Sequence, residues 1–175
     1  MEPYLTILIV VSIIAGLYVF GFLVNISFIA VFCRKLDQHK KALNIVLRQK
    51  YDAEEKIISL LEKNNIPLEE DLKRIYEGIN PDNFSNLDTL NSYKDRTSLS
   101  YLKQSLLATA KGEENFLKNM EYQSNVNIIN DCDEQFRYLV AAYNADILGF
   151  NYWVRFKPYR YFFLINKVET KNIIQ

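Results

Sequence analysis

The chain has 175 residues, with 21 Lys or Arg, 21 Asp or Glu, one histidine and two cysteines. This length allows one domain of ordinary size, or a smaller domain with an appendage. The balanced charge disfavours nucleic-acid binding, which usually needs a basic surplus, so we expect no nucleic-acid partner. So few cysteines and histidines exclude a disulfide framework and a structural zinc site.

The neutral total conceals zones of opposite charge. No charged residue occurs from Pro3 to Cys33, whereas residues 34–50 are basic, residues 51–150 acidic and residues 151–175 basic again. As a helix the uncharged run would reach about 46 Å, and the hydrocarbon core of a bilayer needs about 30 Å. We therefore predict a transmembrane segment over residues 1–33, with the spanning helix between Tyr4 and Phe32.

Two other interpretations of this run are weaker. A cleaved signal peptide needs a basic start, a short apolar region and a small-residue cleavage site, and the run has none of these. A buried core helix of this length would be unusual in so small a protein. Gly16 and Gly21 are five residues apart, which misses the spacing for tight helix pairing. Ser12 lies four residues before Gly16, so this pair indicates either dimerisation or an ordinary glycine of a spanning helix, and a homo-oligomer stays open.

The positive charges that follow the run predict its orientation. Arg34, Lys35, Lys40 and Lys41 lie within ten residues of its end, and no Lys or Arg precedes it. The positive-inside rule then places the amino terminus outside and the rest of the chain in the cytoplasm, with membrane lipid as a partner of these cations. Cys33 lies at the membrane edge, where it is either an ordinary thiol or S-palmitoylated.

Residues 34–150 predict a cytoplasmic helical bundle. Apolar residues at helical spacing indicate a long helix over residues 34–65, a short one that starts at Pro67 and ends near Gly78, one from Leu99 to Ala110, and a long one over residues 113–150. The many Asn, Ser and Asp residues of residues 81–98 predict a loop, in which Leu87 and Leu90 allow one turn of helix. The fold class is all-α, with an N-terminal transmembrane helix followed by an antiparallel bundle of about four helices, two of them long.

Residues 151–175 form a basic aromatic tail. Trp153, Arg155, Lys157 and Arg160 lie in a segment that interleaves aromatic and cationic residues. Antiparallel helices would return this tail to the bilayer, where Trp and Tyr favour the headgroup region and cations favour anionic lipid. The alternative is that the aromatic residues only cap the bundle.

Catalytic and cofactor-binding patterns are not found. His39 has no second or third ligand beside it, and a nucleophile pair would need Cys33 or Cys132 next to it. The acidic residues 131–134 lack the glycine and the spacing of a calcium loop. We predict no metal, no cofactor and no enzyme activity.

Several short strings in this order resemble the LemA family of bacterial membrane proteins. They are Tyr51-Asp52 before an apolar pair, the run from Glu113 to Leu117 with Asn115 at its centre, the pair Tyr143-Asn144, and Phe156-Lys157-Pro158 in the tail. The family's Pro-Asn step after the Tyr-Asp pair is absent here. The resemblance implies an N-terminal span, a long helix and further antiparallel helices, and it implies no activity. Asn115, Tyr143 and Asn144 are the polar positions that resemble the family, and we expect them either to specify packing between helices or to form a small interaction groove.

The function predicted is that of a non-catalytic scaffold or adaptor at the cytoplasmic membrane surface, with protein partners that the sequence does not identify. The alternative is a lipid-engaging or membrane-shaping module that uses the basic residues after the span and the basic aromatic tail.

Overall fold

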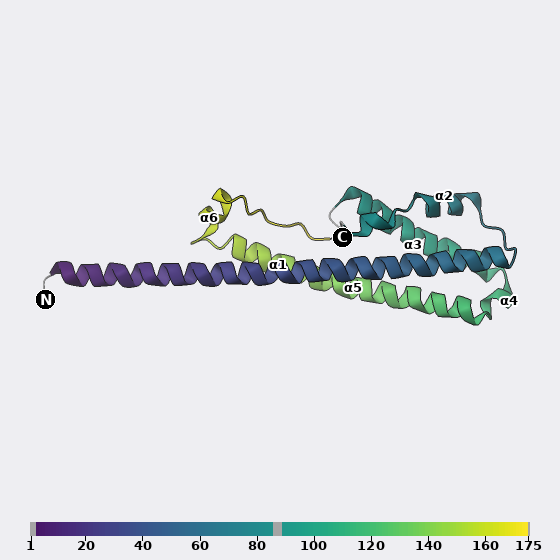
Figure 1. Ribbon diagram of the computed structural model, residues 1–175, viewed down its shortest axis with the longest axis horizontal. Helices are drawn as coiled ribbons and strands as arrows, with labels where there is room; N and C mark the ends of the chain where they lie inside the picture. Colours follow the sequence, from purple (N-terminus) through teal and green to yellow (C-terminus); the bar gives the residue numbers. More distant parts are fainter. Residues whose placement is uncertain (1–2, 86–88, 175) are drawn as a thin grey trace. The chain divides into compact units, whose positions relative to one another are not determined.

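The computed structural model describes residues 3–85 and 89–174, and all regular structure in this part of the chain is helical (Figure 1). The absence of strands from the described ranges confirms the all-α class. Six α-helices and one 3-10 helix occur, against about four helices predicted. They are α1 (Pro3–Lys63), α2 (Glu70–Gly78), η1 (Pro81–Ser85), α3 (Leu90–Lys111), α4 (Glu114–Leu117), α5 (Met120–Val154) and α6 (Arg160–Ile165).

The described residues form two compact units. Unit 1 combines the residues up to Asp37 with Asn144–Ile173, and unit 2 is built from Gln38–Tyr143 together with Ile174. The sequence-based division instead places limits at residues 33 and 150. Helices α1 and α5 each contribute residues to both units.

Helix α1 is a single helix of 61 residues, whereas two successive helices were expected. No Gly or Pro occurs between Phe22 and Ile66, so nothing interrupts its backbone hydrogen bonds. The predicted end at Asn64-Asn65 is confirmed. Asn65 has a φ of 56°, and the N–H groups of Asn65 and Ile66 donate to the carbonyls of Glu62 and Leu61, each at 3.0 Å. This is the left-handed capping turn that Gly or Asn favours.

The second predicted helix begins later than expected. Helix α2 starts at Glu70, so Pro67 lies three residues before the helix and not at its first position. Glu69 precedes the helix with an extended ψ of 140°, which leaves the residues from Pro67 to Glu69 outside it. The predicted end at Gly78 is confirmed.

The loop predicted over residues 81–98 is wrong for most of its length. Residues 81–85 form η1, and α3 begins at Leu90 behind Thr89, whose hydroxyl accepts a hydrogen bond from the N–H of Ser92 at 3.3 Å. Asp95 is buried on this helix and accepts a hydrogen bond from Asn83 of η1 at 2.6 Å. Polar residues therefore pair with each other here. Because some buried positions of the helix are polar, its first turns lack the apolar periodicity by which a helix is predicted from sequence. Leu87 lies outside the described residues.

The long helix predicted over residues 113–150 is interrupted. Helix α4 ends at Leu117, and α5 begins at Met120 after Asn119. The side chain of Asn119 accepts hydrogen bonds from the N–H groups of Glu121 and Tyr122, at 2.8 and 3.3 Å, and thereby caps α5. The break changes the buried face, because Met120, predicted on the apolar stripe, is 84% exposed and Tyr122 is buried.

The core of unit 2 is centred on α3, which contacts α2, η1 and α4. The apolar stripe predicted on α3 is confirmed, since Leu99, Leu102, Leu106 and Ala110 are all at most 1% exposed. Other members of this core are Leu43, Ile57, Leu61, Leu72, Phe84, Phe116 and Ile129.

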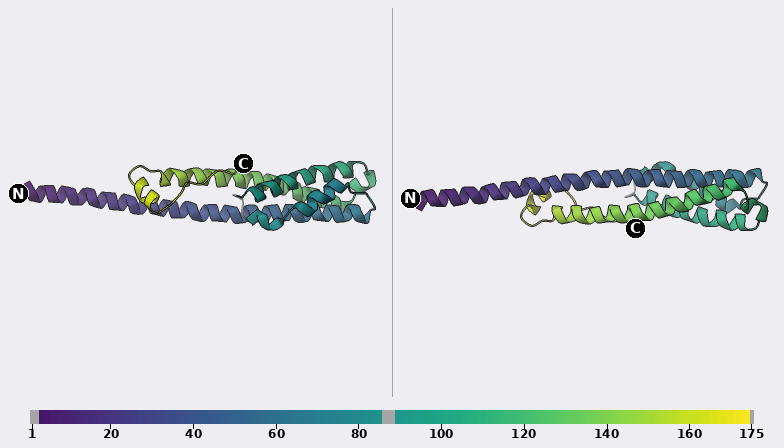
Figure 2. Two further views of the ribbon diagram at one scale, coloured as in Figure 1. Left: turned by 90° about the horizontal axis from the view of Figure 1, so that it is seen from above. Right: turned by 90° about the horizontal axis from the view of Figure 1, so that it is seen from below.

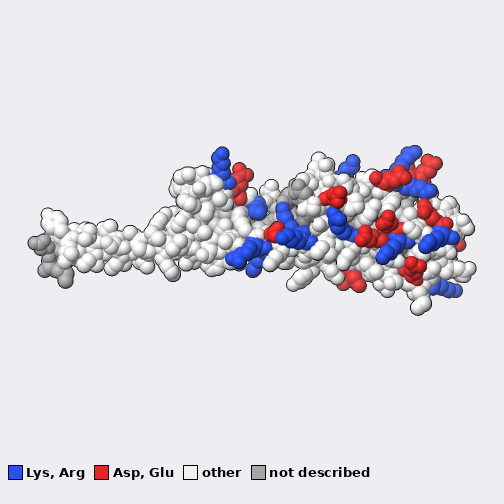
Figure 3. All heavy atoms as spheres, viewed as in Figure 1, with Lys and Arg blue, Asp and Glu red and all other residues white. Residues whose placement is uncertain are grey.

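In unit 1, α1 provides the one helix among the described residues that is long and apolar enough to cross a membrane. Every residue from Pro3 to Phe20 is exposed. The visible face of this stretch carries no Lys, Arg, Asp or Glu (Figure 3).

Candidate functional site

The basic aromatic tail packs against α1 inside unit 1 (Figure 2). Two tyrosines exchange hydrogen bonds across this contact. The hydroxyl of Tyr18 donates to the carbonyl of Pro158 at 2.8 Å, and the hydroxyl of Tyr159 donates to the carbonyl of Tyr18 at 3.0 Å. Each hydroxyl thus satisfies a backbone carbonyl of the other segment, which fixes the position of the tail along the helix.

Gly21 makes room for Tyr159. A Cβ atom at Gly21 would collide with the Tyr159 hydroxyl, whereas a Cβ at Gly16 would meet nothing within 4 Å. The Tyr159 ring lies 5.0 Å from that of Tyr18 and 5.4 Å from that of Phe22, between ring centroids. Gly21 is therefore used for packing within the chain, and Gly16 remains open for the pairing that the sequence analysis considered.

The contact continues one turn further along α1. Asn25 is 1% exposed and donates from Nδ2 to the carbonyl of Trp153 at 3.3 Å. The Trp153 ring stacks on Phe28, with centroids 4.5 Å apart and planes at 4°. Gly149 of α5 lies against the Phe32 ring, which would be 2.5 Å from an added Cβ. These contacts recur at helical spacing along one face of α1.

The tail divides the predicted span into two parts. From Pro3 to Phe20 every residue is exposed, although Tyr18 contacts the tail, whereas from Gly21 to Phe32 one face of α1 is covered by residues 149–163. Helix α6, which the sequence analysis did not predict, is part of this cover. Its buried Phe163 and its half-exposed Phe162 both contact Phe22.

A cavity of about 450 Å³ lies beside α6. Its charged lining consists of the cations Arg155, Arg160 and Lys167 and the carboxylate of Glu169. Arg155 and Arg160 were predicted from the sequence as lipid-surface residues, whereas Lys167 was not. Lys167 lies beyond the aromatic run, and only the basic charge of residues 151–175 as a whole pointed to it.

Hydrogen bonds at two places hold the chain around this cavity. Lys167 has a φ of 55°, and the N–H groups of Lys167 and Val168 donate to the carbonyls of Leu164 and Phe163, at 3.2 and 2.9 Å. Glycine is the usual residue in such a left-handed turn. Asn151 of α5 then both donates to the Lys171 carbonyl and accepts from its N–H, each at 2.8 Å. The residues between these two points are thus fastened at both ends.

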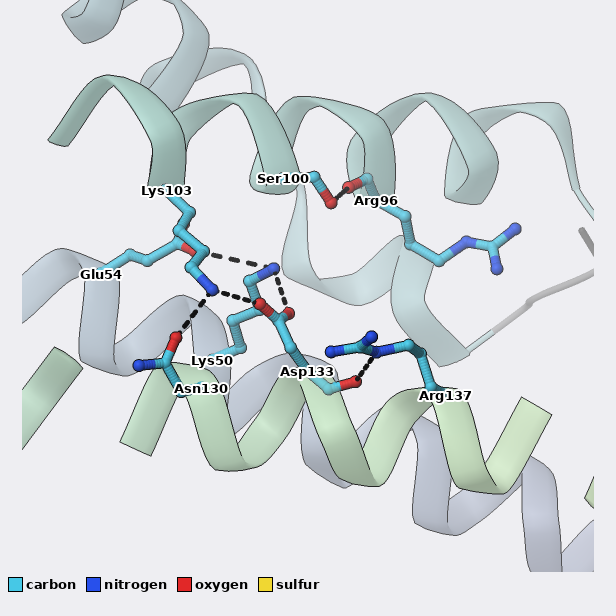
Figure 4. A network of polar contacts seen from close by, with 8 residues as sticks. All are labelled: Lys50, Glu54, Arg96, Ser100, Lys103, Asn130, Asp133 and Arg137. Atoms are coloured by element: carbon cyan, nitrogen blue, oxygen red, sulfur yellow. Dashed lines mark hydrogen bonds and ion pairs between the residues drawn. The ribbon is translucent and has the colours of Figure 1, made fainter. Parts of the chain in front are cut away.

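A second polar site lies inside unit 2 (Figure 4). Asp133 of α5 accepts hydrogen bonds from Lys50 of α1 at 2.7 Å and from Lys103 of α3 at 2.6 Å. Lys103 also donates to Asn130 at 2.9 Å. The Asp133 carboxyl is partly buried, which by itself would raise its pKa, but the two ammonium groups outweigh burial and lower the pKa.

Glu54 is the member of this site without a close partner. It is 0% exposed, and neither carboxyl oxygen has a hydrogen-bond partner among the described residues. The Lys50 Nζ lies 4.0 Å from Glu54 Oε1, too far for a hydrogen bond, because Asp133 binds that ammonium group. Burial raises the pKa of Glu54 from 4.5 to about 8, against the opposing attraction of Lys50. Glu54 is thus mostly a neutral acid at pH 7.

The space beside this site is small. A cavity of about 50 Å³ is lined by Lys50, Cys132 and Asp133, among others. Pockets for organic ligands usually measure about 300–1,000 Å³, and one water occupies about 30 Å³. The cavity therefore has room for a water molecule or two beside the charged groups. Burial also raises the pKa of the Cys132 thiol, which keeps it protonated and unreactive.

The predicted lipid-surface residues lie in different places. Trp153, Arg155 and Arg160 come together in unit 1, and Lys157 is exposed beside them and outside the cavity. The remaining four follow the apolar run on α1. Arg34 and Lys35 belong to unit 1, and Lys35 lies 4.0 Å from Asp146, whereas Lys40 and Lys41 belong to unit 2.

The residues that resemble LemA motifs are all in described parts of the chain. Tyr51 stacks on Tyr76 of α2 at 5.6 Å, and Asp52 is exposed. Tyr143 is 1% exposed, and Asn144 is half-buried. Asn115, expected to be buried between helices, is exposed on the short helix α4, because the break before α5 turns it outward.

Comparison of the chain with protein-family models, with curated proteins and with solved structures gives no match.

We expect Gly21→Leu to displace the tail from α1, because a side chain at this position collides with Tyr159. Overpacking of this kind costs about 1–3 kcal/mol. Trp153, the only tryptophan, would lose its stacking on Phe28, so its fluorescence spectrum reports the change. Gly16→Leu adds the same side chain in open space and should leave the spectrum unchanged. Equal spectra for both variants would contradict the packing described.

We expect the stability of unit 2 to fall as the pH rises from 4.5 to 8. The folded state holds a proton on Glu54 over this range that the unfolded state releases, at about 1.4 kcal/mol per pH unit. Glu54→Gln should abolish most of this loss, and the exposed Glu62→Gln on the same helix should not. Thermal unfolding of the full chain in detergent, followed by circular dichroism from pH 5 to pH 9, measures the difference.

Proposed function

We propose that the chain is a single-pass membrane protein that holds a helical domain at the cytoplasmic surface as a non-catalytic scaffold. The observation that carries this proposal is the uncovered apolar stretch from Pro3 to Phe20. At about 1.5 Å per residue, its 18 residues rise about 27 Å, close to the thickness of a hydrocarbon core. In water, this surface would be exposed to solvent, with Tyr18 in contact with the Tyr159 ring at its carboxyl end.

The cations of the tail limit how far the bilayer extends along α1. Arg155, Lys157 and Arg160 are exposed in the segment that packs beside Tyr18–Phe28. A cation at the centre of a bilayer costs about 2.5–3.5 kcal/mol, whereas the headgroup region accommodates it. We therefore place Pro3–Phe20 in the hydrocarbon and the tail in the headgroup region.

The orientation follows from the distribution of cations around this stretch. All of the cations named above lie on its carboxyl side, so the positive-inside rule favours a cytoplasmic location for unit 2 and for the tail of unit 1, and an external amino terminus. We further propose the antiparallel bundle arrangement for residues 34–150 that the resemblance to LemA implies. Support comes from the ion pairs that join α1 and α3 to α5 within unit 2.

A non-catalytic role is favoured by the size of the cavity beside the charged site of unit 2. Asp133, whose pKa is lowered, lines a cavity of about 50 Å³ that accommodates a water molecule or two and no organic substrate. We propose that Lys50, Asp133 and Lys103 serve to join α1, α5 and α3.

A second candidate function is lipid engagement by the tail itself. Helix α6 exposes four large apolar side chains, and this observation favours the alternative. Tyr161, Phe162, Leu164 and Ile165 are 45–80% exposed on a helix of six residues. Such a surface fits the headgroup and acyl boundary of a bilayer.

The anchor is tested by the two natural cysteines. We expect the chain to stay in the membrane fraction after carbonate washing, and a membrane-impermeant maleimide to label Cys33 only after the cells are permeabilised. Cys33 is exposed, and buried Cys132 should not react. With both cysteines changed to Ser, Glu2→Cys, which precedes the stretch placed in the hydrocarbon, should be labelled on intact cells. Recovery of the chain in the soluble fraction, or labelling of Cys33 on intact cells, would contradict the anchor or its orientation.

The scaffold role is tested by photocrosslinking in cells. We expect azidophenylalanine at Tyr138, which is 76% exposed on α5, to give discrete crosslinked products. A product at twice the mass of the chain would identify a homo-oligomer. The same residue at buried Tyr143, one turn further along α5, is the control and should give none. A Tyr138 variant that gives no products argues against a protein partner at this face.

A further inference from the structure

The cavity beside α6 concentrates positive charge that the chain does not neutralise. Arg155, Arg160 and Lys167 line it, and among the described residues none forms an ion pair with these three side chains. Glu169 is the single carboxylate in the lining. By contrast, Lys35 in the same unit lies beside Asp146, and Lys171 lies over the Phe150 ring. An excess of two positive charges around one hollow favours an anionic occupant.

The backbone around the cavity is held in a way that keeps Lys167 in place. Lys167 occupies the left-handed position of the turn after α6, where glycine would be the easier residue. A non-glycine residue in this conformation suggests that its side chain is needed, and here that side chain lines the cavity. At the other end of the segment, the side chain of Asn151 forms two hydrogen bonds with the backbone of Lys171 and holds it in place.

The surroundings indicate which anion fits. Leu164 belongs to the cavity lining and is 57% exposed, and Ile165, next to it on α6, is 80% exposed. An occupant would therefore meet both cations and apolar side chains, and the exposed Ile165 lies next to the lining residue Leu164 in sequence. A phospholipid has a phosphate beside its acyl chains, whereas a free phosphate ion would leave the apolar surface unused. The cavity volume, about 450 Å³, is of the size that takes up a small headgroup.

We propose that Arg155, Arg160 and Lys167 bind the phosphate of an anionic phospholipid in this cavity, with its acyl chains beside Leu164 and Ile165. This inference rests on the membrane anchor proposed above. This proposal differs from general attraction to a negative surface. It predicts that removal of a cation inside the cavity weakens lipid binding, whereas removal of an exposed cation outside the cavity does not.

The test uses the purified full chain in neutral detergent micelles, titrated with phosphatidylglycerol, with phosphatidylcholine and with inorganic phosphate. Fluorescence of the single Trp153, two residues from Arg155, reports binding, and native mass spectrometry counts retained lipids. We expect Arg160→Gln and Lys167→Gly each to weaken phosphatidylglycerol binding about fivefold. Lys167→Gly suits the turn, because glycine prefers its left-handed conformation.

Two further variants separate this site from a change in folding or in net charge. Lys157→Gln removes one exposed cation of the same tail outside the cavity and should change binding less than about twofold. Glu169→Gln removes the carboxylate of the lining and should tighten binding, a result that misfolding does not produce.

Equal losses in Lys157→Gln and Lys167→Gly would overturn the site in favour of diffuse charge attraction. Inorganic phosphate that binds as tightly as phosphatidylglycerol would overturn the lipid as ligand, and equal affinity for phosphatidylcholine would overturn the requirement for an anionic lipid. The micelle titration does not depend on location in cells. A chain that binds the lipid but is recovered in the soluble fraction of cells therefore rejects the anchor alone.

Discussion

The hydroxyl of Tyr159 lies against the backbone of α1 at Gly21, a position where any side chain would collide with it. The rest of unit 1 is arranged around this contact. It brings the tail close enough for the tyrosine hydrogen bonds and for the stacking of Trp153 on Phe28. The same placement sets where the uncovered apolar stretch ends, and it holds α6 and the cationic cavity at that point of α1.

The two units use charge in opposite ways. In the buried site of unit 2, Lys50 and Lys103 both bind Asp133, and burial keeps Glu54 neutral, so these four side chains offer little charge to a ligand. A network of this kind contributes little net stability but specifies which helix faces meet. In unit 1 the cations of the cavity keep their charge unpaired within the described chain. Only the second arrangement suits recognition of an anion.

The helical class, the long apolar helix of the uncharged run and the ends of two helices were predicted from the sequence, because each depends on local chemistry. Asn65 and Gly78 end helices through their own backbone preferences. The start of α3 and the break before α5 were missed, since Thr89 and Asn119 act through single side-chain caps in segments without an apolar period. The contact of the tail with α1 links residues about 140 positions apart, and no periodicity within either segment encodes it. Lys167 was missed because its turn is visible only in the backbone conformation.

The three hydrogen bonds that fasten the tail to α1 run from side chains to backbone carbonyls, and their value depends on the solvent around them. In water the aromatic rings have most to gain from contact, while water competes for the hydroxyl and amide groups. Among lipids the hydrogen bonds matter more than the ring contacts. Acyl chains can replace the apolar neighbours of the rings at little loss, but they offer no hydrogen-bond acceptor to Tyr18, Asn25 or Tyr159. The same fold-back is thus secured by different forces in an aqueous and in a lipid setting, and it can persist through transfer from one to the other.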